Sequence, residues 1–135
     1  MSSTTKGSLM IEVGAGELID KITILRIKAA RMTDPAKLGN VKHELDVLSH
    51  ARAENLSQSV ELDRLEETLR MVNEKLWVIE DDIRACEAAR DFGTKFIELA
   101  RSVYIQNDKR AAIKKSINEL CGSSIVEEKS YTEFS

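Results

Sequence analysis

Two polar residues interrupt an apolar stripe in the second half of the chain, and they are strong candidates for chemistry. Gln106 and Arg110 stand where the surrounding spacing otherwise places apolar side chains. A guanidinium buried there needs a partner. Four residues are candidates for that partner: Asn73 and Glu80 on a preceding helix, and Glu17 and Asp20 nearer the N-terminus. The result is either a structural ion pair or a polar pocket near Trp77, the only tryptophan.

A second candidate is a pair of cations near the N-terminus. Lys28 and Arg31 are three residues apart, so on a helix they share one face and can grip a carboxylate or phosphate. A solvated charged face, which also includes Asp20 and Lys21, is the alternative interpretation. An anionic small molecule is the ligand class that such cations would take.

The remaining motifs do not indicate a cofactor or a metal. Gly14-Ala15-Gly16 before a helix would suit a phosphate-cradling turn or simply a tight turn into the helix, and the acidic Glu17 and Asp20 favour the second. His43 and His50 are roughly 10 Å apart along a helix, too far to share one zinc ion. No Ser-His-Asp or Cys-His arrangement indicates catalysis, so we expect no catalytic residue, no cofactor and no metal.

The elements that must position these residues follow from the apolar spacing. Between residues 62 and 86, apolar residues recur in a 3-4 rhythm, as they do on one face of a long helix. The members of this first seam are Leu62, Leu65, Leu69, Val72, Leu76, Ile79, Ile83 and Cys86. The members of the second seam are Phe96, Leu99, Val103, Gln106, Arg110, Ile113, Ile117 and Leu120. The short break at residues 91–93 predicts a long antiparallel helical hairpin, similar to a coiled coil.

Two shorter helices precede this hairpin. The first spans about Glu17 to Met32, and the second begins at Asp34-Pro35 and continues to about Arg52. Ser57 or Ser59 can cap the third helix, and Gly122 can end the fourth. We therefore predict one all-α domain over residues 1–135, with the hairpin packed against a two-helix pair. Residues 1–8 are expected to be disordered and 123–135 to form an extended tail.

The two ends of the chain are predicted to meet. Residues 9–13 alternate weakly, and the tail carries Ile125, Val126 and Tyr131. Backbone pairing between the two segments would bring Glu127 and Glu128 towards Lys21, Lys28 or Arg31. This charged cluster is a candidate binding surface. The alternative is a tail that only covers apolar surface on the bundle.

Composition and net charge limit the classes of partner that this chain is expected to bind. The chain has 135 residues, 42% of them hydrophobic and 32% charged, and a net charge of −3 without a basic stripe, so we expect no nucleic-acid partner. The absence of a run of about 20 apolar residues argues against a membrane span. A polar start argues against a signal peptide, and two cysteines placed far apart indicate free thiols in the cytoplasm. Apolar residues off the seam, such as Val60 and Val78, favour self-association as a homodimer.

The segment from Gly16 to Leu25 is distinctive, as is the terminal segment from Ile125 to Tyr131. Together with Ile27-Lys28 and Asn40-Val41, they resemble a family of small bacterial proteins of unknown function. The resemblance covers most of the chain and implies no established activity. It implies a setting near glycosyltransferases and cell-surface polysaccharides. The apolar seams and the lack of a catalytic constellation favour a non-catalytic binding or assembly module.

A looser resemblance is to the all-helical chorismate mutases. Ile19-Asp20, Arg31 and Gln106 resemble residues of that family, whereas Pro35 breaks the first helix where the enzymes continue theirs. This resemblance implies an alternative function: a small helical enzyme that acts on an anionic metabolite. Lys28, Arg31 and Arg110 would then bind the anion. Such an enzyme requires these cations to converge in one pocket.

Overall fold

The computed structural model describes residues 7–125 and 127–133, and within these ranges every regular element is a helix. The prediction of an all-α fold is therefore confirmed. The four helices of the described chain are α1 (Ala15–Arg31), α2 (Pro35–Asn55), α3 (Val60–Ala88) and α4 (Thr94–Cys121).

Side-chain caps explain where two of these helices begin, and a glycine ends a third. The Asp34 carboxylate accepts a hydrogen bond from the Ala36 amide at 3.0 Å, which fixes the start of α2. Ser59, rather than Ser57, caps α3, because its hydroxyl accepts from the Leu62 amide at 3.0 Å. Gly122 ends α4 in the left-handed conformation, with φ of 66°. Since α2 continues to Asn55, it is three residues longer than the sequence predicts.

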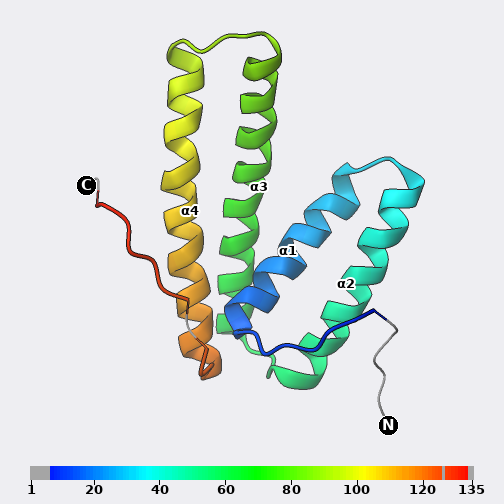
Figure 1. Ribbon diagram of the computed structural model, residues 1–135. Coiled ribbons are helices and arrows are strands. Elements are labelled where there is room, and N and C mark those ends of the chain that lie inside the picture. The colour runs from blue at the N-terminus through cyan, green and yellow to red at the C-terminus, as the bar shows by residue number, and fades with distance from the viewer. Residues whose placement is uncertain (1–6, 126, 134–135) are drawn as a thin grey trace.

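Helix α1 is the centre of the arrangement. Figure 1 shows α3 and α4 side by side, joined at one end by a short link, with α1 crossing the opposite half of the pair. Helix α2 lies along α1 on the side away from α4 (Figure 1). Helix α1 packs against each of the other three helices, as its wide apolar surface requires.

The core lies at this crossing. Ile19 of α1, Leu62 and Leu69 of α3 and Ile117 of α4 are almost completely buried and form one cluster. Three of these four residues belong to the two predicted seams. Most of the other buried apolar residues of the described chain lie on α1, which the seams do not include. Ile19 joins the seam residues because α1 inserts its apolar face over the pair.

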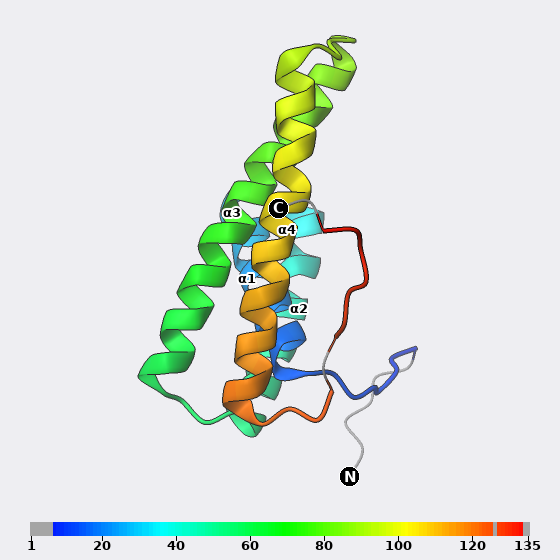
Figure 2. The same ribbon diagram turned by 90° about the vertical axis from the view of Figure 1, so that its left-hand side faces the viewer.

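The predicted pairing of the two ends of the chain is wrong for the residues that the structure describes. Leu9 and Ile11 are 89% and 77% exposed, and no backbone hydrogen bond joins residues 9–13 to the described part of the tail. The two segments approach each other only around Gly14 and Ile125. From there the tail runs back along α4 while the N-terminal segment leaves the body (Figure 2). Residues 1–6, Val126 and residues 134–135, all included in the predictions for the two ends, lie outside the described residues.

Three further findings apply to the described ranges. Cys86 and Cys121 are free thiols, as the sequence predicts. None of the four helices is long and apolar enough to cross a membrane. Within residues 7–125 and 127–133, no three His, Cys, Asp or Glu side chains gather as metal ligands would.

Candidate functional site

An ion pair with a buried carboxylate joins Asp20 of α1 to Arg110 of α4. Helix α1 places the Asp20 carboxylate at its crossing with α4, where the side chain is only 1% exposed. Arg110 Nε donates to Oδ1 at 2.9 Å, and Nη2 donates to Oδ2 at 2.5 Å. This two-point geometry is the strong form of an arginine–carboxylate pair. Of the four partners predicted for Arg110, Asp20 is the one that binds it most closely.

Helix α3 completes the environment of the buried carboxylate. Asn73 Nδ2 donates to Asp20 Oδ1 and to Thr23 Oγ1, both at 2.9 Å. The Thr23 hydroxyl in turn donates to the Asp20 backbone carbonyl at 2.7 Å. Asp20 thus ties α1 to both α3 and α4, and its buried charge is satisfied by hydrogen bonds from two helices.

Lys114 extends this network towards the C-terminal tail. Its Nζ lies 2.8 Å from Glu17 Oε2, 3.1 Å from Glu127 Oε1 and 3.9 Å from Asp20 Oδ2. The lysine side chain is only 12% exposed. The sequence reasoning missed Lys114. The signal was its position four residues after Arg110, which places both cations on the same face of α4.

The ion pairs shift the titration of these groups. The hydrogen bond from Lys114 holds the pKa of Glu17 below its usual value, and it outweighs the opposing effect of partial burial. Burial acts to lower the pKa of Lys114, but its hydrogen bonds with Glu17 and Glu127 leave that pKa raised. The hydrogen bond with Asp20 is the largest cause of the raised pKa of Arg110.

The lowered pKa of Glu17 predicts a pH dependence of stability. An ionised Glu17 stabilises the fold above the ordinary glutamate pKa of 4.5, and this contribution is lost as the pH falls through its lower folded-state pKa. In urea denaturation, Glu17→Gln should lower the free energy of unfolding by about 0.5–1 kcal/mol at pH 7. The difference between variant and wild type should shrink as the pH falls below 4.5.

Glu44→Gln, at an exposed position on α2, is the matched control. Its difference from wild type should stay nearly constant over the same pH range. If Glu17→Gln behaves like Glu44→Gln at every pH, the Glu17–Lys114 pair contributes nothing to stability.

Glycine is needed at position 16 because α1 and α4 pack closely there. Neither of the predicted roles, a phosphate-cradling turn or a tight turn into the helix, explains it. A Cβ at this position would lie 2.4 Å from the Lys114 backbone carbonyl, so the backbones of α1 and α4 meet there. The Gly16 amide donates to Asn118 Oδ1 at 2.7 Å and is therefore not presented to a phosphate. The turn into the helix is ordinary, because Gly14 has extended backbone angles that other residues also adopt.

The charged cluster predicted around Lys21, Lys28 and Arg31 does not form. Arg31 pairs with Glu74 of α3, roughly 16 Å along α1 from Asp20. Lys21 is exposed and lies 3.9 Å from Glu17, and Lys28 is partly buried elsewhere on α1.

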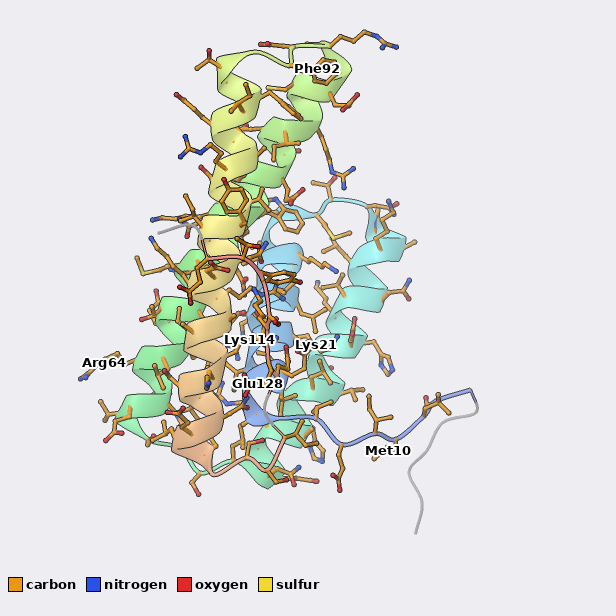
Figure 3. All side chains as sticks on the ribbon, turned by 60° about the vertical axis from the view of Figure 1, so that its left-hand side comes forward. Met10, Lys21, Arg64, Phe92, Lys114 and Glu128 are labelled. Atoms are coloured by element: carbon orange, nitrogen blue, oxygen red, sulfur yellow. The ribbon has the colours of Figure 1, made fainter. Side chains whose placement is uncertain are left out.

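Glu127 and Glu128, the acidic residues of the predicted cluster, lie away from the cations of α1 because the tail follows α4. Glu127 binds Lys114, whereas Glu128 is exposed. Figure 3 shows Lys114 and Glu128 near the tail where it passes over the helices.

A second buried carboxylate supports the other side of α1. Glu66 of α3 accepts from Arg26 at 2.8 Å and also pairs with Arg52 of α2. This triad joins α1, α2 and α3, and the sequence reasoning did not identify it. Two buried carboxylates, Asp20 and Glu66, therefore connect α1 to all of its neighbours.

Two hollows adjoin Arg110. The first, which we call the Trp77 cleft, has a volume of about 390 Å³ and is lined by Ile24, Ile27, Asn73, Leu76, Trp77, Glu80, Asp81, Arg84, Asn107 and Arg110. The second, the tail pocket, has a volume of about 300 Å³ and is lined by Asn107, Arg110, Ala111, Lys114, Lys115, Asn118, Glu127 and Lys129. Arg110 and Asn107 line both. Gln106 lines neither, and its buried Oε1 lacks a hydrogen-bond donor within the described chain.

Comparison with known proteins places the chain in a family without assigning an activity. Residues 9–134 match a family of unknown function, DUF6165, and the chain belongs to that family. The predicted membership of a family of unknown function is thus confirmed. No curated protein and no solved structure matches the chain.

Proposed function

We propose that this protein is a non-catalytic binding module whose ligand occupies the Trp77 cleft. The observation that carries the proposal is the position of the only tryptophan. Trp77 lines a cleft of about 390 Å³ between α1 and the α3–α4 pair, together with Ile24 and Ile27. Hollows of this size, with an apolar wall and a few convergent polar groups, are typical of small-molecule sites.

The lining favours a ligand with one apolar face and several hydroxyl groups. An aromatic ring and two isoleucines form the apolar wall, and hydrogen-bonding groups come from Asp81, Arg84 and Asn107. A saccharide unit has this chemistry. A link to cell-surface polysaccharide systems, implied by the sequence resemblance, is part of the proposal and agrees with such a ligand.

Binding is favoured over catalysis because the cations expected to converge on a substrate do not share a pocket: Lys28 and Arg31 line neither of the hollows beside Arg110. Arg110 is held by Asp20, and Arg31 is held by Glu74. The chorismate mutase-like alternative needs Asp20, Arg31 and Gln106 around one substrate, and none of these three lines the Trp77 cleft.

Trp77 provides a direct test, since its fluorescence reports on the cleft alone. Titration with a panel of neutral and acidic oligosaccharides should shift or quench the emission saturably for at least one member. Arg84→Ala should weaken that binding, because Arg84 lines the cleft and is exposed. Arg64→Ala is the matched control: this residue lies on the same helix and points into solvent (Figure 3), so its removal should leave binding unchanged.

A flat emission signal with every saccharide would contradict the proposed ligand class. Equal loss of saccharide binding in the Arg64→Ala and Arg84→Ala variants would contradict the proposal that the ligand binds in the Trp77 cleft. Turnover of any panel member would contradict the non-catalytic assignment.

We also propose that the protein self-associates as a homodimer and that α3 packs on α4 as in a coiled coil. The end of the α3–α4 pair that α1 does not cover carries Phe92 and Ile97, each about half exposed. A second copy of the chain is one partner that would cover these apolar side chains.

A further inference from the structure

We propose that the tail pocket is a phosphate subsite of the Trp77 cleft and that Glu127 occupies it as an internal anion until a phosphorylated ligand displaces it. This inference rests on the proposed binding function and deepens it by naming a chemical group of the ligand. It concerns a part of the surface where α4 and the C-terminal tail lie side by side (Figure 2).

The first observation is the charge of the lining. Four of its residues are cationic: Arg110, Lys114, Lys115 and Lys129. Glu127 is the only acidic residue in that lining, and it belongs to the tail rather than to a helix. Helix α4 supplies three of the four cations, and the tail supplies Lys129 together with the carboxylate.

The second observation is that the cations retain donor capacity. Arg110 uses Nε and Nη2 for Asp20, while Nη1 has only a long contact of 3.4 Å to Asn107 Oδ1. Lys129 Nζ has three long contacts: it lies 3.5 Å from the Asn107 carbonyl, 3.7 Å from Asp108 and 5.7 Å from the centre of the Tyr131 ring. These donors sit beside Lys114, which is held rigidly by Glu17.

The third observation is the balance of charge that would follow displacement of Glu127. Asp20 and Glu17 stay in place behind Arg110 and Lys114 and neutralise two of the four cations. Lys129 lies 3.7 Å from Asp108, so Lys115 is the lining cation without an ion pair among the described residues, and it gives the hollow a net positive charge. A phosphate monoester carries close to two negative charges at neutral pH and has three acceptor oxygens, so it matches this hollow better than a carboxylate.

Glu127 is suited to reversible displacement. Its side chain is 59% exposed, and its ion pair is with Lys114, which keeps Glu17 as a second partner. Exposed ion pairs of this kind are weak. The Glu127 side chain can therefore rotate away from Lys114, with the rest of the tail in place, without disturbing the Asp20–Arg110 contact.

The two hollows are neighbours, because Arg110 and Asn107 line both. A single ligand can place an apolar or sugar ring against Trp77 and its phosphate among Lys114, Lys115 and Lys129. The proposed ligand class is thus a phosphorylated compound with a ring.

Phenyl phosphate, inorganic phosphate and phenol are the probes for this proposal, measured by calorimetric titration of the full chain at fixed ionic strength. Phenyl phosphate should bind at least about tenfold more tightly than either half-probe, because the two hollows share one wall. Trp77 emission should change with phenyl phosphate and phenol but much less with inorganic phosphate.

Variants that remove a single charge from the tail pocket test where the phosphate binds. Glu127→Gln should strengthen phosphate binding by roughly three- to fivefold, because the internal competitor is removed. Lys115→Gln should weaken it by a similar factor. Glu128→Gln and Lys109→Gln, at exposed positions on the same tail and helix, are the matched controls and should leave the affinity unchanged.

The possible results separate this inference from the proposed function. Saturable saccharide binding at Trp77 with no response to either phosphate probe would overturn the phosphate subsite and leave the binding module intact. Phosphate binding that depends on Lys115 and Glu127 without any Trp77 response would support the subsite and count against the Trp77 cleft. Equal effects of Glu127→Gln and Glu128→Gln would overturn the role of the tail carboxylate.

Discussion

Asp20→Ala should be the most destabilising single change on the polar face of α1, lowering the free energy of unfolding by about 3–5 kcal/mol. The substitution leaves the Arg110 guanidinium half-buried without its carboxylate partner, and it removes one of the two acceptors for Asn73 Nδ2. An uncompensated charge of this kind destabilises a fold more than the intact pair stabilises it. Urea denaturation followed by circular dichroism measures the change.

A double-mutant cycle with Arg110→Met separates the ion pair from simple loss of packing. The double variant should be less destabilised than the sum of the two single variants, because it no longer leaves a charge unpaired. Glu74→Ala is the control: it breaks the more exposed Arg31–Glu74 pair and should lower stability by no more than about 1 kcal/mol. Similar losses for Asp20→Ala and Glu74→Ala would show that burial of Asp20 carries no special energetic weight.

The Asp20–Arg110 contact illustrates what could be predicted from the sequence. The heptad rhythm placed Arg110 on the buried face of α4 and so implied a partner. The rhythm did not show which of four candidates is that partner: Asp20, Glu17, Asn73 or Glu80. A heptad repeat specifies how two helices face each other, not where a third helix crosses them. The crossing depends on which apolar residues of α1 fit between α3 and α4, and Ile19 at the centre of the core sets that position.

The tail was harder to predict for a different reason. Its apolar residues suggested strand pairing with residues 9–13, since alternation is the pattern of a half-buried strand. In the structure the tail is positioned by charged side chains instead, through Glu127 on Lys114 and Lys129 near Asp108. Alternation over a few residues does not show whether a second strand is within reach, and here Gly122 turns the tail back along α4, away from the N-terminal segment.

Gly16→Ala should be the second large effect, and its direction is opposite to the usual one. Alanine in place of glycine inside a helix normally stabilises it by about 0.5–1 kcal/mol. At position 16, the new methyl group would lie 2.4 Å from the Lys114 carbonyl oxygen and 3.1 Å from Asn118 Oδ1. Because the nearest atoms belong to backbone, α1 and α4 must move apart, and we expect a loss of about 1–3 kcal/mol or more in urea denaturation.

Gly39→Ala is the matched control because Gly39 also lies within a helix, and a Cβ there would meet nothing within 4 Å. It should raise stability by about 0.5–1 kcal/mol, so the same chemical change should have opposite signs at the two sites. A stabilising Gly16→Ala would mean that α1 and α4 do not touch at this point. The Glu17–Lys114 and Asp20–Arg110 contacts depend on the same close approach, so that result would contradict them as well.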